Sequence, residues 1–234
     1  MKRLFGFTLA ETLIVMGIIG VVAALTLPNL NSSTGDKEKV TKLQKIYSNL
    51  NDAIGRAEIV YGPITGWTAN DNTDETKNKR LGERITEFMK ISKNCGTNKG
   101  QGCFKNSAVK YLNNSNYINF DNYNYYKVIL ADGSSLSFHA GTGKLLIVNV
   151  DIDGPNKGSN TFGKDFFEFW ITSPTDGILP MNYSTALQDC FKKGSSCTKW
   201  VIDNGNMDYL KADNDGKCPD GKTILDGTTN ITCK

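Results

Sequence analysis

Three aspartates near the middle of the chain have the spacing that most resembles a set of metal ligands. Asp151 and Asp153 alternate along the sequence just before Gly154, and Asp165 follows Gly163. Carboxylate oxygens at alternate positions before a glycine are typical of the start of a calcium-binding loop. The full ligand spacing of an EF-hand is missing, because no glutamate stands at its twelfth position. The favoured interpretation is an acidic, glycine-rich connection between two strands, and calcium binding by the three aspartates is the alternative.

The residues needed for common catalytic mechanisms are scarce. His139 is the only histidine, and it follows Phe138 at the end of a predicted strand. Any serine or cysteine nucleophile would depend on this one base, and no nucleophile motif accompanies it. The sequence contains no phosphate-binding P-loop, no dinucleotide-binding glycine pattern and no zinc-protease helix. We therefore expect no enzymatic activity, and no cofactor apart from the calcium alternative.

Six cysteines form an even set, Cys95, Cys103, Cys190, Cys197, Cys218 and Cys233. An even number favours disulfides in an oxidising compartment, and a zinc site is not expected because the chain has no C-x-x-C pair. Fifteen pairings are possible for six cysteines. Short separations favour the pairs Cys95–Cys103 and Cys190–Cys197, which leaves Cys218–Cys233. The main competitor pairs Cys197 with Cys218.

Charge and aromatic residues give little indication of a nucleic-acid partner. The net charge is +3 over 234 residues, and the lysines and arginines form no dense block. Several aromatic residues stand near scattered lysines and could stack on the bases of a single strand, namely Tyr117, Phe120, Tyr123, Tyr125 and Tyr126. Strand alternation explains them more simply, so no nucleic-acid partner is predicted.

Glu11 is the only ionisable residue in an apolar segment that continues to Leu27. The segment approaches the roughly 20 residues that span about 30 Å of hydrocarbon. Lys2 and Arg3 precede it, which favours a cytoplasmic N-terminus with the rest of the chain outside. A carboxylate within such a segment is costly to bury, so it indicates a functional site with a specific cationic partner.

The residues Gly6-Phe7-Thr8-Leu9-Ala10-Glu11 resemble the class III signal of type IV pilins and type II secretion pseudopilins. In that family a prepilin peptidase cleaves after the glycine and methylates the new N-terminal phenylalanine. The family's glutamate is the fifth residue of the mature chain, and Glu11 matches it when counting starts at Phe7. Pro28 falls at the twenty-second mature position, where many pilins also have proline. The resemblance covers about the first thirty residues.

The resemblance implies a structural subunit of a type IV pilus or of a type II secretion pseudopilus. Gly6 would be the cleavage position, Phe7 the methylated residue, Glu11 the assembly contact and Pro28 the helix kink. Glu11 would pair with the Phe7 amine of a neighbouring subunit, because a missed pairing in an apolar core costs several kcal/mol. The implied partners are the prepilin peptidase, other pilin or pseudopilin subunits, the inner-membrane assembly platform and, before assembly, membrane lipid.

The expected location is the bacterial inner membrane, where a single N-terminal helix would hold a globular domain outside the cytoplasm until the subunit joins a periplasmic or cell-surface filament. Two other interpretations stay open. An ordinary signal peptide would be cleaved after Val22-Ala23-Ala24 and would release a secreted, disulfide-containing binding domain that begins near Leu25. An uncleaved helix would anchor that domain by a single span. Neither alternative requires Gly6, Phe7 and Glu11 at their positions.

The pattern of the chain predicts four segments. Residues 1–6 are the leader, residues 7–30 the transmembrane and assembly helix, residues 31–62 an amphipathic helix, and residues 63–234 an extracytoplasmic, pilin-like globular domain. A kink or a partly melted turn is expected after Pro28, and helix resumes by Asp36. Apolar residues then recur every three or four positions, at Val40, Leu43, Tyr47, Leu50, Ile54, Ala57 and Tyr61.

The predicted fold class is α+β, because the helix comes first and contiguous strands follow. Strand-like runs occupy residues 125–130, 135–138, 144–150 and 166–171, and a shorter helix is expected over residues 76–92. A long N-terminal helix, transmembrane in its first half and amphipathic in its second, would pack on a three- to four-stranded antiparallel sheet. A loop-rich, disulfide-held C-terminal region follows, in which Trp200-Val201-Ile202 is a short strand or core-touching segment.

Overall fold

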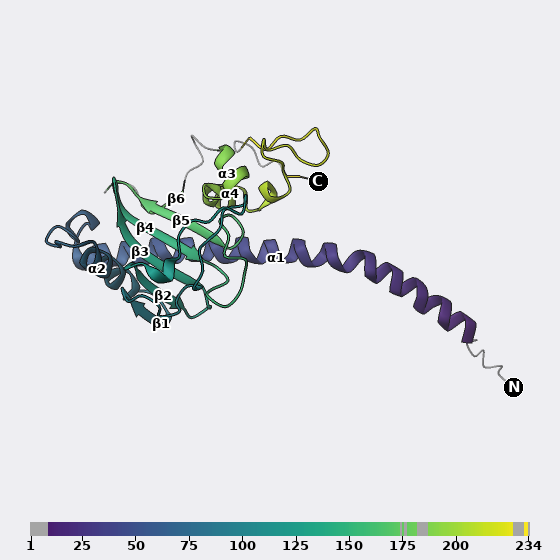
Figure 1. Cartoon of the computed structure of the whole chain (residues 1–234), viewed down its shortest axis with the longest axis horizontal. Coiled ribbons are helices and arrows are strands. Elements are labelled where there is room, and N and C mark those ends of the chain that lie inside the picture. The colour runs from purple at the N-terminus through teal and green to yellow at the C-terminus, as the bar shows by residue number, and fades with distance from the viewer. Residues whose placement is uncertain (1–8, 174, 176, 182–186, 227–231, 234) are drawn as a thin grey trace. The chain divides into compact units, whose positions relative to one another are not determined.

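The structure is a computed structural model that describes residues 9–173, 175, 177–181, 187–226 and 232–233, and it describes only the backbone at residues 23–34. The chain divides into two compact units, residues 1–38 and residues 39–234. Helix α1, Leu9–Tyr61, begins in the smaller unit and ends in the larger one. The larger unit contains the sheet and every other helix labelled in Figure 1.

The backbone of α1 is helical throughout its 53 residues, on both sides of Pro28 and across residues 29–35. The sequence predicted a partly melted turn here, because proline lacks an amide donor and the next residues are weak helix formers. That interruption does not occur. Ending a helix and starting it again requires a new and costly nucleus, which favours continuing through the weak positions. A kink at Pro28 itself stays a prediction.

Among the described residues, no helix is both long enough and apolar enough to cross a membrane. The prediction of a transmembrane first half is therefore wrong, and so is the predicted inner-membrane location that depended on it.

The part of α1 within the larger unit supplies a stripe of core residues. The buried side chains are Val40, Leu43, Ile46, Leu50, Ala53, Ile54 and Ala57. Five of the predicted stripe residues are among them, and this side of the helix packs against the sheet, but the prediction was wrong for Tyr61, which is exposed, and it missed Ile46 and Ala53. The Tyr47 ring stacks on that of Phe169, with centroids 5.3 Å apart.

The sheet has six antiparallel strands in the order β1-β2-β3-β4-β5-β6. Their bounds are β1 Ile91–Gly96, β2 Tyr126–Leu130, β3 Ser135–Gly141, β4 Lys144–Asp151, β5 Phe166–Ile171 and β6 Leu179–Pro180. The predicted sheet of three or four strands is therefore wrong. Both added strands are edges: β1 pairs with β2 through two register shifts, and β6 has two residues. Irregular or proline-containing edges lack the alternation that identifies a strand in sequence.

Helix α2, Asp74–Thr86, packs on β2 and β3 after a short 3₁₀ turn at Ile64–Gly66. Thr73 caps its first turn, with its hydroxyl accepting a hydrogen bond from the Thr76 amide at 3.2 Å. The helix ends earlier than the predicted residue 92, because the chain enters β1 at Ile91.

Residues 97–125 cover the face of the sheet opposite α1. Their aromatic side chains form a second core with those of the β4–β5 connection, and its buried members are Cys95, Cys103, Phe104, Val109, Phe120, Phe162 and Phe166. A 3₁₀ turn at Phe120–Asn122 lies within this covering segment. The sheet is thus buried on both faces.

The C-terminal region contains α3, Leu187–Lys193, α4, Cys197–Asn204, and a 3₁₀ turn at Asp208–Leu210. The segment at Trp200 is helical rather than a strand, and the Trp200 side chain is fully buried.

The cysteines pair as Cys95–Cys103, Cys190–Cys197 and Cys218–Cys233, which is the pairing that the sequence favoured.

Candidate functional site

The first described turns of α1 expose large apolar side chains. Nine of them are between 53 and 79 % exposed: Leu9, Leu13, Ile14, Val15, Met16, Ile18, Ile19, Val21 and Val22. They occupy every side of the helix, so no polar face is left to meet water. A continuous apolar surface of this kind marks a place where another molecule or an apolar environment covers the protein. We call residues 9–22 the apolar helix segment.

Glu11 lies in the first turn of α1, within the apolar helix segment. Gly6 and Phe7, the predicted cleavage and methylation residues, lie outside the described residues, as does the side chain of Pro28. The pairing of Glu11 with the Phe7 amine of a neighbouring copy therefore stays a prediction.

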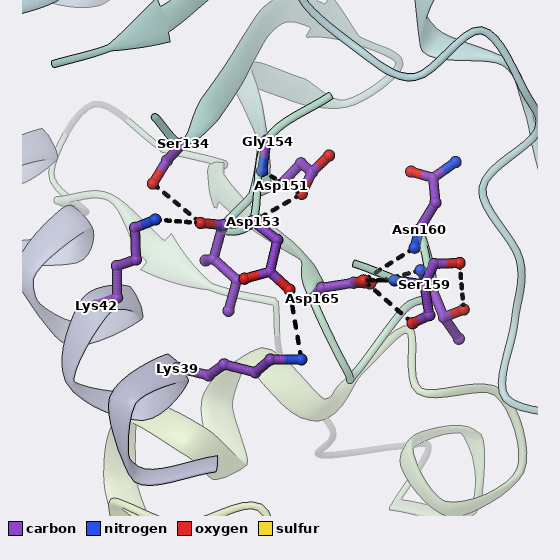
Figure 2. Close-up of polar contacts among 11 residues, drawn as sticks. Lys39, Lys42, Ser134, Asp151, Asp153, Gly154, Ser159, Asn160 and Asp165 are labelled. Atoms are coloured by element: carbon purple, nitrogen blue, oxygen red, sulfur yellow. Dashed lines mark hydrogen bonds and ion pairs between the residues drawn. The ribbon is translucent and has the colours of Figure 1, made fainter. Parts of the chain in front are cut away.

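The connection between β4 and β5 holds the three aspartates singled out in the sequence, and Figure 2 shows them together. Asp151 ends β4 and is 2 % exposed, and its Oδ1 accepts hydrogen bonds from the amides of Asp153 at 3.1 Å and Gly154 at 3.0 Å. Burial, together with the nearby Asp165 carboxylate, raises the pKa of Asp151 to about 8, against the lowering effect of the two amides. The Asp151 carboxyl is therefore mostly protonated at neutral pH.

Asp165 is fully buried and organises the turn that precedes it. Its Oδ2 accepts hydrogen bonds from the Asn160 amide at 2.9 Å, the Ser159 hydroxyl at 3.1 Å and the Ser159 amide, and its Oδ1 accepts one from the Thr161 amide at 2.6 Å. Gly158 has a φ of +73°, and a Cβ there would lie 2.3 Å from Asp165 Oδ2. Consecutive backbone amides thus enclose the carboxylate, as they do in anion-binding turns.

Two lysines of α1 fasten this connection to the helix (Figure 2). Lys39 Nζ lies 3.4 Å from Asp153 Oδ2, and Lys42 Nζ donates a hydrogen bond to the Ile152 carbonyl. The Ser134 hydroxyl donates to the same carbonyl at 3.3 Å. Sequence analysis missed both lysines, because they look like ordinary members of the polar face of an amphipathic helix.

The residues of this connection do not fit a calcium site. In the described part of the chain, no three acidic, histidine or cysteine side chains are placed to hold a metal ion together. All three aspartates accept hydrogen bonds or an ion pair from the chain. Ser135 Oγ and Asn160 Oδ1 are buried nearby without a partner among the described residues, but both are neutral oxygens.

His139 lies at the covered face of the sheet and has no catalytic surroundings in the described residues. Its ring stacks on Tyr125 with centroids 3.9 Å apart, and its Nδ1 has no hydrogen-bond partner there. Burial lowers the pKa of His139 to about 4, so the ring is neutral at physiological pH. The expectation of no enzymatic activity stays a prediction.

A buried polar row crosses the covered face of the sheet, and sequence analysis did not reveal it. Lys127, Ser137, Asn149 and Glu168 are partners in consecutive strand pairs from β2 to β5. Glu168 accepts hydrogen bonds from Asn149 Nδ2 at 2.7 Å and from Trp170 Nε1, and burial raises the pKa of its carboxyl. Their alternation with apolar residues predicts exposure, but residues 97–125 cover them instead.

Comparison with protein families matches residues 29–225 to a family of unknown function (DUF6613). The matched region begins after the prepilin-like motif and includes the whole sheet. Comparisons with curated proteins and with solved structures gave no match. A functional argument therefore depends on the residues of this chain.

Proposed function

The chain belongs to a family of unknown function (DUF6613), and we propose that it is a structural subunit of a type IV pilus or a type II secretion pseudopilus. Neighbouring copies would assemble through the apolar helix segment after a prepilin peptidase has cleaved behind Gly6 and methylated Phe7. The observation that carries the proposal is the exposure of nine large apolar side chains between Leu9 and Val22.

Identical copies are the partner that covers such a helix most completely. Burying one large aliphatic side chain contributes about 1.5–3 kcal/mol, so this segment could contribute on the order of 10 kcal/mol before the costs of association. A bundle of equivalent helices covers all sides at once. Gly17 and Gly20 would allow neighbouring helices to approach closely, because glycine has no side chain, and no other atom of the structure occupies the space beside either residue.

Glu11 would determine the register of the assembled helices. A carboxylate enclosed by apolar side chains costs several kcal/mol unless a cation meets it. Cleavage before Phe7 would create a cationic amine close to the same end of the helix, and a staggered neighbour could bring that amine to Glu11. The pair would select one stagger more than it would add stability.

The described core and disulfides of the larger unit contain no residue of the apolar helix segment. The core begins at Val40, and all three disulfides lie within residues 39–234. A substitution among residues 9–22 should therefore alter assembly without unfolding the domain.

Assembly is tested by producing full-length variants in the native host and measuring the protein recovered in the sheared, sedimentable filament fraction. Glu11→Ala should reduce that fraction strongly, whereas Glu38→Ala, which removes an acid at the end of the smaller unit, should not. Total protein and the thermal midpoint should be unchanged in both. Normal filament recovery with Glu11→Ala would contradict the proposed contact.

A second pair of variants tests the apolar surface itself. Ile18 and Ile59 are both exposed on α1, by 60 % and 86 %, but only Ile18 lies in the apolar helix segment. Ile18→Asp should abolish recovery in the filament fraction, because a charge would be buried between copies, and Ile59→Asp should leave it unchanged. If neither variant alters the fraction, or if no sedimentable fraction exists, the chain is not a filament subunit.

A further inference from the structure

A cavity of about 350 Å³ lies in the larger unit between α1, the chain that follows α2, and the turn between β2 and β3. Its volume is at the lower end of the roughly 300–1,000 Å³ typical of small-molecule sites. It is separate from the apolar helix segment and from the β4–β5 connection, so an inference from it does not depend on the proposed filament role.

The floor of the cavity is apolar, and a backbone hydrogen bond connects two of the segments that form its walls. Phe88 and Met89 are half-buried, and Leu130 is 5 % exposed. The Ala131 amide donates a hydrogen bond of 2.9 Å to the Lys90 carbonyl, which joins the β2–β3 turn to the chain after α2. The cavity is therefore formed before any ligand arrives, which lowers the cost of binding.

Two lysines that line this cavity have no ion-pair partner among the described residues. Lys45 and Lys90 are exposed side chains that line it from different elements. Among the ion pairs and side-chain hydrogen bonds of the described residues, neither ammonium group has a partner. Each is therefore available to an anion.

The two acids that line the cavity already have partners in the chain. Asp52 lies 3.6 Å from Arg56, whose guanidinium also stacks 4.9 Å above the Phe88 ring. Asp132 Oδ1 accepts a hydrogen bond from the Ser134 amide at 3.1 Å. The Asp132 carboxylate keeps its charge, but with Arg56 counted three cations and two carboxylates surround an apolar floor, so the net charge around the cavity is positive.

We propose that this cavity binds a small amphipathic carboxylate. The apolar body of the ligand would contact Phe88, Met89 and Leu130, and its carboxylate would lie between Lys45 and Lys90. An uncharged ligand of the same length would leave the two ammonium groups without an anion, and a cationic one would be repelled.

The proposal is tested by isothermal titration calorimetry of the full chain with octanoate, 1-octanol and octyltrimethylammonium, each below its aggregation concentration. Octanoate should bind about tenfold more tightly than octanol, as expected for two exposed charge contacts, and the cation should bind most weakly. Equal binding of all three, or no binding of octanoate at millimolar concentration, would overturn the proposal.

Variants then locate the site. Lys45→Gln combined with Lys90→Gln should weaken octanoate about tenfold and leave octanol unchanged, whereas Lys99→Gln combined with Lys222→Gln should alter neither. Ala131→Phe should fill the cavity and abolish binding of both ligands. Thermal midpoints establish that the variants fold. Undiminished octanoate binding to the Lys45/Lys90 double variant and to Ala131→Phe would overturn the proposed site.

Discussion

Replacing Gly82 in α2 by alanine should destabilise the protein, whereas replacing a helical glycine by alanine usually stabilises it. A Cβ built at Gly82 would lie 2.1 Å from Cδ1, 2.2 Å from Cγ and 2.6 Å from Cβ of Tyr126. Tyr126 is 3 % exposed, and its hydroxyl accepts a hydrogen bond of 2.7 Å from Asn94 Nδ2. Because the clash reaches the Tyr126 Cβ, rotation of the ring cannot relieve it, and α2 must move away from β2.

The magnitude follows from two opposing effects. Alanine stabilises a helix interior by about 1 kcal/mol relative to glycine. Overpacking a well-filled interior costs about 1–3 kcal/mol, and a clash that extends to Cβ belongs in the upper part of that range. Gly82→Ala should therefore lower the free energy of unfolding by about 1–2 kcal/mol. Gly55 in α1 is the matched control, because nothing lies within 4 Å of its Cβ position, and Gly55→Ala should raise stability by about 0.5–1 kcal/mol.

Urea unfolding of the oxidised protein measures both values, provided that the slope of the transition is the same in all three proteins. The expected result is opposite shifts of the midpoint, with Gly82→Ala below the parent protein and Gly55→Ala above it. If Gly82→Ala matched or exceeded the stability of Gly55→Ala, the packing of α2 on β2 described above would be wrong.

Three further results are expected. Because burial raises the pKa of Asp151 to about 8, the folded protein binds an extra proton between about pH 4 and pH 8, and its stability falls as the pH rises through that range. Urea unfolding curves of Asp151→Asn should no longer show this loss of stability. If the stability of the variant depended on pH as the parent's does, the prediction would be contradicted. Millimolar calcium should leave the thermal midpoint unchanged, because Asp151, Asp153 and Asp165 already have partners within the chain, and a rise of several degrees would show a metal site. Replacing Cys95 and Cys103 together by serine should lower the unfolding free energy by about 2.5 kcal/mol, the value for a loop of this length, and no loss would show that the bond is absent in the natural protein.

Local patterns predicted the parts of the fold in which neighbouring residues decide the structure. The three-and-four spacing from Val40 onward identified the core side of α1, because helix geometry alone places those residues together. The strand-like runs at residues 125–130 and 135–138 correspond to β2 and β3, and the tight turn between them contains Gly133 with a φ of +85°. The short separation of Cys95 and Cys103 favoured the pair that forms.

Features that depend on distant residues were not predictable. The edge strands β1 and β6 exist because neighbouring strands offer free hydrogen-bonding groups, and the sequence of a two-residue strand contains no such information. The covered polar row containing Glu168 resembles the exposed face of a strand until residues 97–125 fold over it.

The candidate sites also differ in whether local sequence or distant residues determine them. Glu11 was recognised by contrast with its apolar neighbours, and the exposure of those neighbours is now visible in the structure. The role of Asp165 depends on three backbone amides that converge in a turn where both Gly158 and Asn160 adopt a positive φ. The cavity near Phe88 is assembled from three elements far apart in the chain, and no local pattern indicates it.

Mass spectrometry of the mature protein's first tryptic peptide tests the filament proposal most directly. Trypsin has no site between Arg3 and Lys37, so the peptide that ends at Lys37 reports the true N-terminus. We expect it to begin at Phe7 and to carry one additional methyl group. A peptide that begins near Leu25, or one that begins at Leu4 and so shows an uncleaved leader, would contradict assembly through a processed apolar helix.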